Sequence, residues 1–261
     1  MKKRINGRID RRYGSWLKRT LLEEQRKLTA NKIRGHRKKF LAFSTYPKNR
    51  DFQSIINEES FDIKKAVGSM LKRKGRLFVL DSGAGYLGVS SDLKKYFGSK
   101  VFVTALNPIS PVLLQPKKRA MNLIKNSGEI PFRRKKELIE AQYNELKEVE
   151  RRSKEINEYK VGVIENFSSK KYYDIIVDFM GPLRYSDFTK RVLYKYFTLL
   201  KPEGAVFTKV FAEDVLKIKK IISDYYGRGG NIPKKARCYF RIRRIPGTGI
   251  HEIKKIPLKT G

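Results

Sequence analysis

The stretch that most constrains the fold of this 261-residue chain is 77–88, which reads LFVLDSGAGYLG. Its four leading apolar residues predict a short buried strand, which Asp81 ends. The loop that follows contains Gly83, Ala84 and Gly85 and leads into a helical pattern. A strand that passes through a glycine turn into a helix brings bare backbone close to a ligand, at the carboxyl end of a parallel strand. We therefore place the candidate site at this loop.

Two classes of cofactor compete for the glycine loop. Gly83, Gly85 and Gly88 spell the G-x-G-x-x-G fingerprint of dinucleotide-binding proteins, which needs an acid about 20 residues further on for the ribose. The next predicted strand, 100–104, instead leads to Asn107 without an acid. An acidic strand end followed by G-x-G resembles motif I of the S-adenosylmethionine-dependent methyltransferases. We prefer this interpretation to a nicotinamide or flavin site and to an ordinary strand turn.

Strands and helices alternate along the remainder of the chain. Further strands are expected at 161–164, 174–178, 205–211 and 238–245. Helices are expected at 61–71, 87–97, 112–125, 190–200 and 213–225. This alternation predicts an α/β sheet with helices on both faces.

The charge of the chain points to its partner. It carries 60 Lys and Arg residues against 26 Asp and Glu, a formal net charge of +34. A compact fold repels itself at such a charge, so a polyanionic partner is the economical explanation. The basic residues are spread over the whole chain, which favours nucleic acid over a membrane surface. Adaptation to heat would raise the content of Glu together with that of Lys, whereas this chain has far fewer acidic than basic residues.

We expect two parts in the chain. Residues 1–60 form a basic, partly helical extension in which a Lys/Arg cluster at 34–39 precedes three aromatic residues, a combination that suits RNA phosphates and bases. The alternative is a solvated arm whose aromatic residues pack on the main domain. Residues 61–261 form the α/β domain, interrupted at 133–159 by a charged helical insertion that we interpret as a surface helix, with a partner-binding arm as the alternative.

Several classes of protein are disfavoured. The single Cys238 excludes a disulfide framework within the chain, and with only His36 and His251 in addition the sequence argues against zinc. No apolar run approaches the ~20 residues of a membrane span. The N-terminus lacks the apolar core of a secretory signal, so we expect a cytoplasmic protein; its scarcity of acids leaves a mitochondrial presequence as the alternative.

Two further charged residues stand where buried strands should be apolar. Asp178 ends the strand 174–178, and Lys209 lies late in the strand 205–211. The carboxyl ends of parallel strands share one edge, so these side chains could meet beside the cofactor. The alternative is a structural salt bridge or a lysine that extends to the rim of the sheet.

From about residue 61 to residue 243, the chain resembles the FtsJ-like family of RNA 2′-O-methyltransferases. The family's Leu-x-Pro-Gly-Gly turn and its Lys-Val-Phe strand are similar to 200–204 (LKPEG) and 207–211 (FTKVF). Its fourth-strand motif, an Asp followed closely by a Pro, is similar to 178–182 (DFMGP). The resemblance implies a Rossmann-like methyltransferase sheet, S-adenosylmethionine as cofactor, and methyl transfer to a ribose hydroxyl of a structured RNA such as rRNA, with ribosomal particles as a possible partner.

The resemblance also implies roles for individual residues. The family uses a Lys-Asp-Lys-Glu tetrad, of which Asp178 and Lys209 match the middle two members and Lys64 or Lys65 the first. Lys209 would then steer the hydroxyl and stabilise its developing negative charge, with Asp178 holding Lys209 in place. The cofactor would lie against residues from the strand ends and the glycine loop: Asp81, Gly83, Ala84, Gly85, Asn107, Glu165 and Asn166.

The chain departs from the family pattern at two places. No acid stands near Tyr239, where the tetrad Glu is expected, and Asn107 replaces the acid that usually follows the second strand. These departures favour an alternative function, a catalytically inactive RNA-binding or ribosome-associated protein of the same fold. An amino-methyltransferase is a third interpretation, weakened because 178–182 lacks an Asn/Asp-Pro-Pro-aromatic sequence.

Overall fold

The computed structural model describes residues 50–107, 144, 147–179, 181–185, 188–225 and 238–258. The chain divides into two compact units, 1–46 with 109–151 and 47–108 with 152–261. All the strands described below belong to the second unit. The predicted helix at 112–125 and the basic cluster at 34–39 lie outside the described residues, and of the predicted insertion the described part is helical at 147–155.

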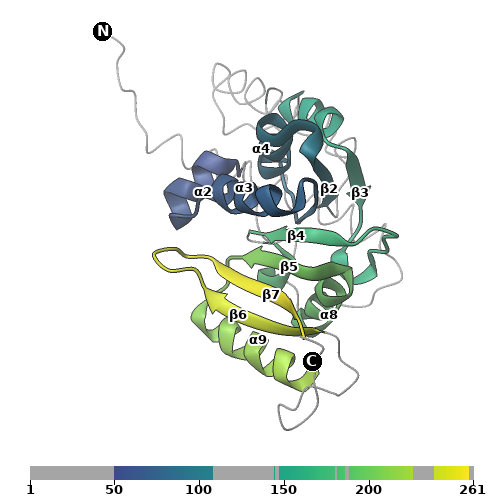
Figure 1. The fold of residues 1–261 in the computed structure, drawn as a ribbon. Helices are drawn as coiled ribbons and strands as arrows, with labels where there is room; N and C mark the ends of the chain where they lie inside the picture. The colour runs from purple at the N-terminus through teal and green to yellow at the C-terminus, as the bar shows by residue number, and fades with distance from the viewer. Residues whose placement is uncertain are drawn as a thin grey trace, which may run out of the picture. The chain divides into compact units, whose positions relative to one another are not determined.

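Seven strands form one sheet in the order β3-β2-β1-β4-β5-β7-β6 (Figure 1). Neighbouring strands among the first five are parallel, whereas β7 is antiparallel to both β5 and β6. This is a Rossmann-like α/β sheet, and the predicted fold class is confirmed. The strands are β1 (Leu77–Ser82), β2 (Val101–Asn107), β3 (Glu158–Val161), β4 (Tyr173–Asp178), β5 (Leu200–Thr208), β6 (Cys238–Arg244) and β7 (His251–Pro257).

Three strand predictions need correction. The third strand, β3, lies three residues earlier than expected, and a 3-10 turn, η3 (Ile164–Asn166), occupies part of the predicted range. The fifth runs from Leu200 to Thr208 rather than over 205–211, so Lys209 lies just after it instead of within it. The C-terminal segment holds two strands instead of one, because charged residues interrupt the apolar pattern of β7, which reads HEIKKIP.

One face of the sheet packs against two helices, α8 (Thr189–Leu199) and α9 (Ala212–Tyr225). Aligned residues of four neighbouring strands share a buried cluster with them: Leu80, Ile176, Val206 and Ile253. Phe197 of α8 stacks on Phe240 of β6, with ring centroids 3.8 Å apart. Successive side chains of a strand point to opposite faces of the sheet, and on this face the apolar ones form the core with α8 and α9.

The opposite face is covered by α3 (Ile63–Lys74) and α4 (Gly88–Phe97) (Figure 1). Ile63, Val67 and Met70 are buried on one side of α3, at the spacing of an amphipathic helix. Helices thus cover both faces, as predicted. On this side an additional helix, α2 (Phe52–Glu59), begins at a capping box formed with Asp51 and lies within the range that the sequence assigned to the N-terminal extension.

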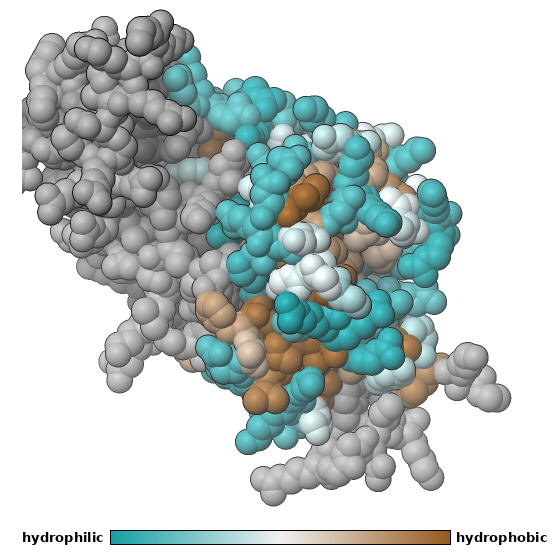
Figure 2. Space-filling model, turned by 90° about the vertical axis from the view of Figure 1, so that its left-hand side faces the viewer, coloured by the Kyte–Doolittle hydropathy of each residue, from teal (hydrophilic) through white to brown (hydrophobic). Residues whose placement is uncertain are grey.

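The surface agrees with the composition. Figure 2 shows one side of the described chain as largely hydrophilic, with smaller hydrophobic areas. No helix among the described residues is long and apolar enough to cross a bilayer.

Candidate functional site

The glycine loop joins β1 to α4 at the carboxyl edge of the parallel strands. Gly83 and Gly85 have φ values of 77° and 51°, in the region that favours glycine. A side chain at Gly83 would also lie 3.1 Å from the Gly181 Cα and 3.2 Å from Pro182. The backbone N–H groups of Gly83 and Ala84 donate to the Leu106 carbonyl of β2, at 2.9 and 3.2 Å. The loop is therefore a tight turn that tolerates no side chain at Gly83.

Asp81 lies at the end of β1, directly before the loop, and its carboxylate is buried. The Ser90 hydroxyl of α4 donates to Asp81 Oδ2 at 2.6 Å. Burial raises the pKa of Asp81 to about 6, although the Ser90 hydrogen bond and the charge of Arg50 act in the opposite direction. Such raised pKa values of buried carboxyl groups are common at functional sites.

Asn107, the last residue of β2, lies beside the same loop. Its side-chain amide donates to the Gly85 carbonyl at 3.0 Å, so it holds the turn from the neighbouring strand. It also hydrogen-bonds Tyr159 of β3, whose pKa burial nevertheless raises. The structure therefore brings Asp81, Asn107 and the loop together, as the sequence predicts. A contact between Asn107 and a ribose stays a prediction.

Glu165 and Asn166 lie in the 3-10 turn after β3. This turn packs beside α8. Burial raises the pKa of Tyr196 of α8, and the charge of Glu165 adds to that rise. Their predicted contact with a cofactor is not tested by these positions.

Asp178 ends β4 and is fully buried. The Tyr196 hydroxyl of α8 donates to Asp178 Oδ2 at 2.7 Å, and the Leu183 backbone N–H donates to the same oxygen at 3.0 Å. The Tyr196 oxygen also lies 2.9 Å from the Ser82 hydroxyl of β1. Burial raises the pKa of Asp178 to about 7. This carboxyl group therefore joins β1, β4 and α8.

Lys209 follows β5 directly, and its ammonium pairs with the carboxylate of Glu59, the last residue of α2. The predicted pair with Asp178 is wrong, and the register of the strands explains why. Asp178 is aligned with Thr208, so these two side chains share a face. Lys209 is the next residue, just beyond β5, and its side chain turns to the opposite face, where it meets Glu59 of α2.

Lys64 lies on the outer part of α3, and its ammonium is 3.9 Å from the centre of the Tyr96 ring of α4. Lys65, the alternative candidate for the first lysine of the tetrad, lines a hollow between α3 and β5. Within the described residues, neither lysine forms an ion pair with Asp178. The two lysine positions of the tetrad that the resemblance implies are therefore not paired with Asp178.

Three residues at this edge were missed. Arg50 donates to the Phe179 carbonyl, directly after Asp178, and its charge opposes the burial that raises the pKa of both Asp81 and Asp178. Glu59 and Tyr196 are the others. Arg50 was hidden among 60 basic residues, and Glu59 has no distinguishing neighbours in the sequence. The aromatic residues of α8 gave no sign of which hydroxyl would be buried.

Comparison with known proteins gives structural similarity alone. No protein-family model and no curated protein sequence matches the chain. A candidate rRNA methylase of Clostridium thermocellum is similar at 11% identity and a TM-score of 0.41, over 75% of this chain and 97% of that one. A candidate S-adenosylmethionine-dependent methyltransferase of Methanococcus maripaludis is similar at 15% identity and a TM-score of 0.43, over 86% of this chain and 97% of that one. A candidate class I S-adenosylmethionine-dependent methyltransferase of Listeria monocytogenes is similar at 10% identity and a TM-score of 0.47, over 94% of this chain and 70% of that one.

Proposed function

We propose that the protein is an S-adenosylmethionine-dependent methyltransferase that acts on RNA. The observation that carries the proposal is the convergence, at the carboxyl edge of a methyltransferase-type sheet, of the glycine loop with Asp81 and Asn107. Ligands of open α/β sheets bind at this edge, near the point where the strand order reverses, which here lies between β1 and β4. The sulfonium of the cofactor is a cation, and the carboxylate of Asp81 suits it electrostatically.

The RNA part of the proposal is supported by charge. A net charge of +34 favours a polyanionic substrate, and we propose structured RNA such as rRNA. The protein would bind this RNA in the cytoplasm, either free or as part of a ribosomal particle. The cofactor supplies the methyl group. Lys209, whose side chain is 30% exposed, is a cation at this edge that can reach a ribose hydroxyl and stabilise negative charge on its oxygen. Glu59 holds Lys209 in place, the role that the sequence assigned to Asp178.

Two measurements on the full chain test this function. Isothermal titration with S-adenosylmethionine tests the cofactor. Incubation with labelled cofactor and RNA, followed by digestion to nucleosides and mass spectrometry, tests transfer and distinguishes ribose from base methylation. We expect saturable cofactor binding and a 2′-O-methylated nucleoside. A methylated base would retain the enzyme class and refute the ribose specificity.

The second candidate is a non-catalytic RNA-binding protein with the same fold. It is favoured by the burial of Asp178, whose hydrogen bonds go to Tyr196 and Leu183 rather than to a reactive group. In this case RNA binding would be intact while no binding of S-adenosylmethionine is detected at millimolar concentration. That result would refute the enzyme.

A further inference from the structure

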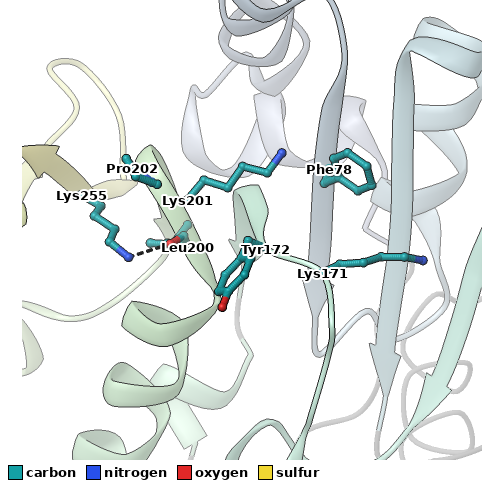
Figure 3. Close-up of a pocket in the computed structure, with 7 residues that line it drawn as sticks. All are labelled: Phe78, Lys171, Tyr172, Leu200, Lys201, Pro202 and Lys255. Atoms are coloured by element: carbon teal, nitrogen blue, oxygen red, sulfur yellow. Dashed lines mark hydrogen bonds between the residues drawn. The ribbon is translucent and has the colours of Figure 1, made fainter.

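A separate hollow lies at the opposite edge of the sheet, where the parallel strands begin (Figure 3). Its volume is about 350 Å³, and it lies beside the first residues of β1 and β5, the residues just before β4 and the later part of β7. The lining residues are mostly apolar or basic: Phe78, Lys171, Tyr172, Leu200, Lys201, Pro202 and Lys255. Because β1 has six residues, ~20 Å separates this hollow from the glycine loop. A ligand here would leave the candidate cofactor site free.

Tyr172 is the aromatic ring that this hollow offers to a ligand. Its side chain is 61% exposed, although it lies directly before a fully buried strand. Among the described residues it has no hydrogen-bond partner and no ring contact. The ring of Phe78, in contrast, is already covered, because the Lys201 ammonium lies 4.4 Å from its centre. In Figure 3 the ring of Tyr172 lies below Lys201, with Leu200 on one side of it and Lys171 on the other.

The cations around Tyr172 outnumber the acids. Lys74 and Lys201 share a single carboxylate, that of Asp174, at 3.0 and 2.8 Å. The Lys255 ammonium donates to two backbone carbonyls, those of Phe197 and Leu200, at 3.1 and 2.7 Å, and forms no ion pair within the described residues. Two ammonium groups thus share one carboxylate and the third has none, so these four groups together are net positive.

Lys171 contributes less to this surplus. Its ammonium points away from Tyr172 in Figure 3 and pairs with Glu158 at 2.5 Å. It also lies 4.0 Å from the centre of the Phe102 ring. The positive side of the hollow is therefore the side of Lys201 and Lys255.

We propose that this hollow binds one unpaired nucleotide of the substrate RNA, with the base stacked on Tyr172 and its phosphate near Lys201 and Lys255. The proposal rests on the RNA-binding part of the proposed function. Exposed aromatic rings beside cations are the usual means of binding single-stranded RNA without sequence preference. An apolar peptide would also fit the lining, but the surplus of ammonium groups and the net charge of +34 favour the polyanion.

The test uses the full chain and an oligoadenylate labelled with 2-aminopurine, whose fluorescence is quenched by stacking. Tyr172→Ala should weaken RNA affinity ~10-fold and abolish the quenching, whereas Tyr172→Phe keeps the ring and should stay within about twofold of the original. Leu216→Ala is the matched control, because Leu216 is an apolar residue of α9 that is 69% exposed and lies outside the hollow. It should leave the affinity unchanged.

Inorganic polyphosphate serves as a polyanion without bases. Its affinity should be the same for the original protein and for Tyr172→Ala, because the substitution removes no charge. Unchanged oligoadenylate affinity in Tyr172→Ala would overturn the proposal, and so would a loss of polyphosphate affinity equal to the loss of RNA affinity. Titration of S-adenosylmethionine into the same samples separates the two proposals. If the original protein does not bind the cofactor, the methyltransferase is refuted. If RNA binding still depends on Tyr172, this site is supported all the same.

Discussion

The ammonium of Lys209 pairs with the carboxylate of Glu59, although 150 residues separate them in the sequence. Glu59 is 8% exposed, so the ion pair is partly removed from water. The last residue of α2 thereby reaches the carboxyl end of β5. No acid follows the pattern of the FtsJ-like tetrad near Tyr239, and Glu59 supplies a carboxylate to Lys209 from the other end of the sequence.

Lys209→Ala should abolish methyl transfer and leave RNA affinity nearly unchanged. The reason is that one cation among 60 basic residues contributes little to a diffuse electrostatic affinity, whereas stabilisation of charge at the reacting oxygen typically contributes 10²–10³-fold in rate. The measurement is the rate of labelled methyl transfer to RNA, with filter binding of the same RNA. Normal turnover in this variant would refute the role of Lys209.

Glu59→Gln tests the partner of Lys209 separately. It removes the charge but keeps the size of the side chain, so Lys209 should lose its fixed position and methyl transfer should fall by about tenfold or more. Glu58→Gln is the matched control, because Glu58 is the preceding residue of α2 and is exposed. Equal rates for the two variants would show that the ion pair has no part in catalysis.

Tyr196→Phe should destabilise the fold. The hydroxyl of Tyr196 donates to Asp178 and lies next to the Ser82 hydroxyl, and all three groups are buried. Leaving a buried acceptor without its donor costs about 1–3 kcal/mol. The measurement is the free energy of unfolding in urea, and Tyr194→Phe is the control, since Tyr194 makes ring contacts to Phe197 and Tyr225 that do not need its hydroxyl. A similar loss in both variants would contradict the assigned role.

The sequence was sufficient to predict the fold and the glycine loop, because both depend on local pattern. The apolar run before Asp81 and the glycines after it define β1 and the turn, and the structure places α4 within one residue of the expected helix. Asn107 was expected at the end of β2 and lies there. These features need no knowledge of which strands are neighbours.

The pairings between side chains could not be predicted, because they depend on register and on distant segments. The alignment of Asp178 with Thr208 turns Lys209 to the other face, and a shift of one residue would have given the expected pair. The contact of Lys209 with Glu59 depends on where α2 ends, which no pattern in β5 encodes. The strand β7 was missed because its alternation is interrupted by adjacent lysines.

Gly181→Ala should be among the most damaging substitutions in the chain. A methyl group there would collide with Asp178 Oδ1 and lie 2.6 Å from the Ser82 carbonyl oxygen, which are atoms of two buried strands. Overpacking of this kind typically costs about 1–3 kcal/mol or more. Gly162→Ala is the control, because its methyl group would meet nothing within 4 Å. The measurement is the midpoint of thermal unfolding, and comparable midpoints for the two variants would show that the approach of β1 to the loop after β4 is not tight.

The free energy of unfolding should fall as the pH rises from 5 to 8, because Asp178 loses its proton in the folded protein. Asp178→Asn should remove this part of the pH dependence. Burial raises the pKa of Asp178 to about 7 in the folded protein, against a usual value of 3.8. Between these values the folded state keeps a proton that the unfolded state releases, so the stabilisation is fully present below about pH 4 and is lost as the pH rises through 7. The lowered pKa of His251 acts in the opposite sense, and it is present in both proteins.

The quantity to measure is therefore the difference in unfolding free energy between the original protein and Asp178→Asn at each pH. A difference that stays constant from pH 5 to pH 8 would mean that Asp178 is ionised throughout this range, so that its ionised form, and not the acid, accepts the hydrogen bond from Tyr196.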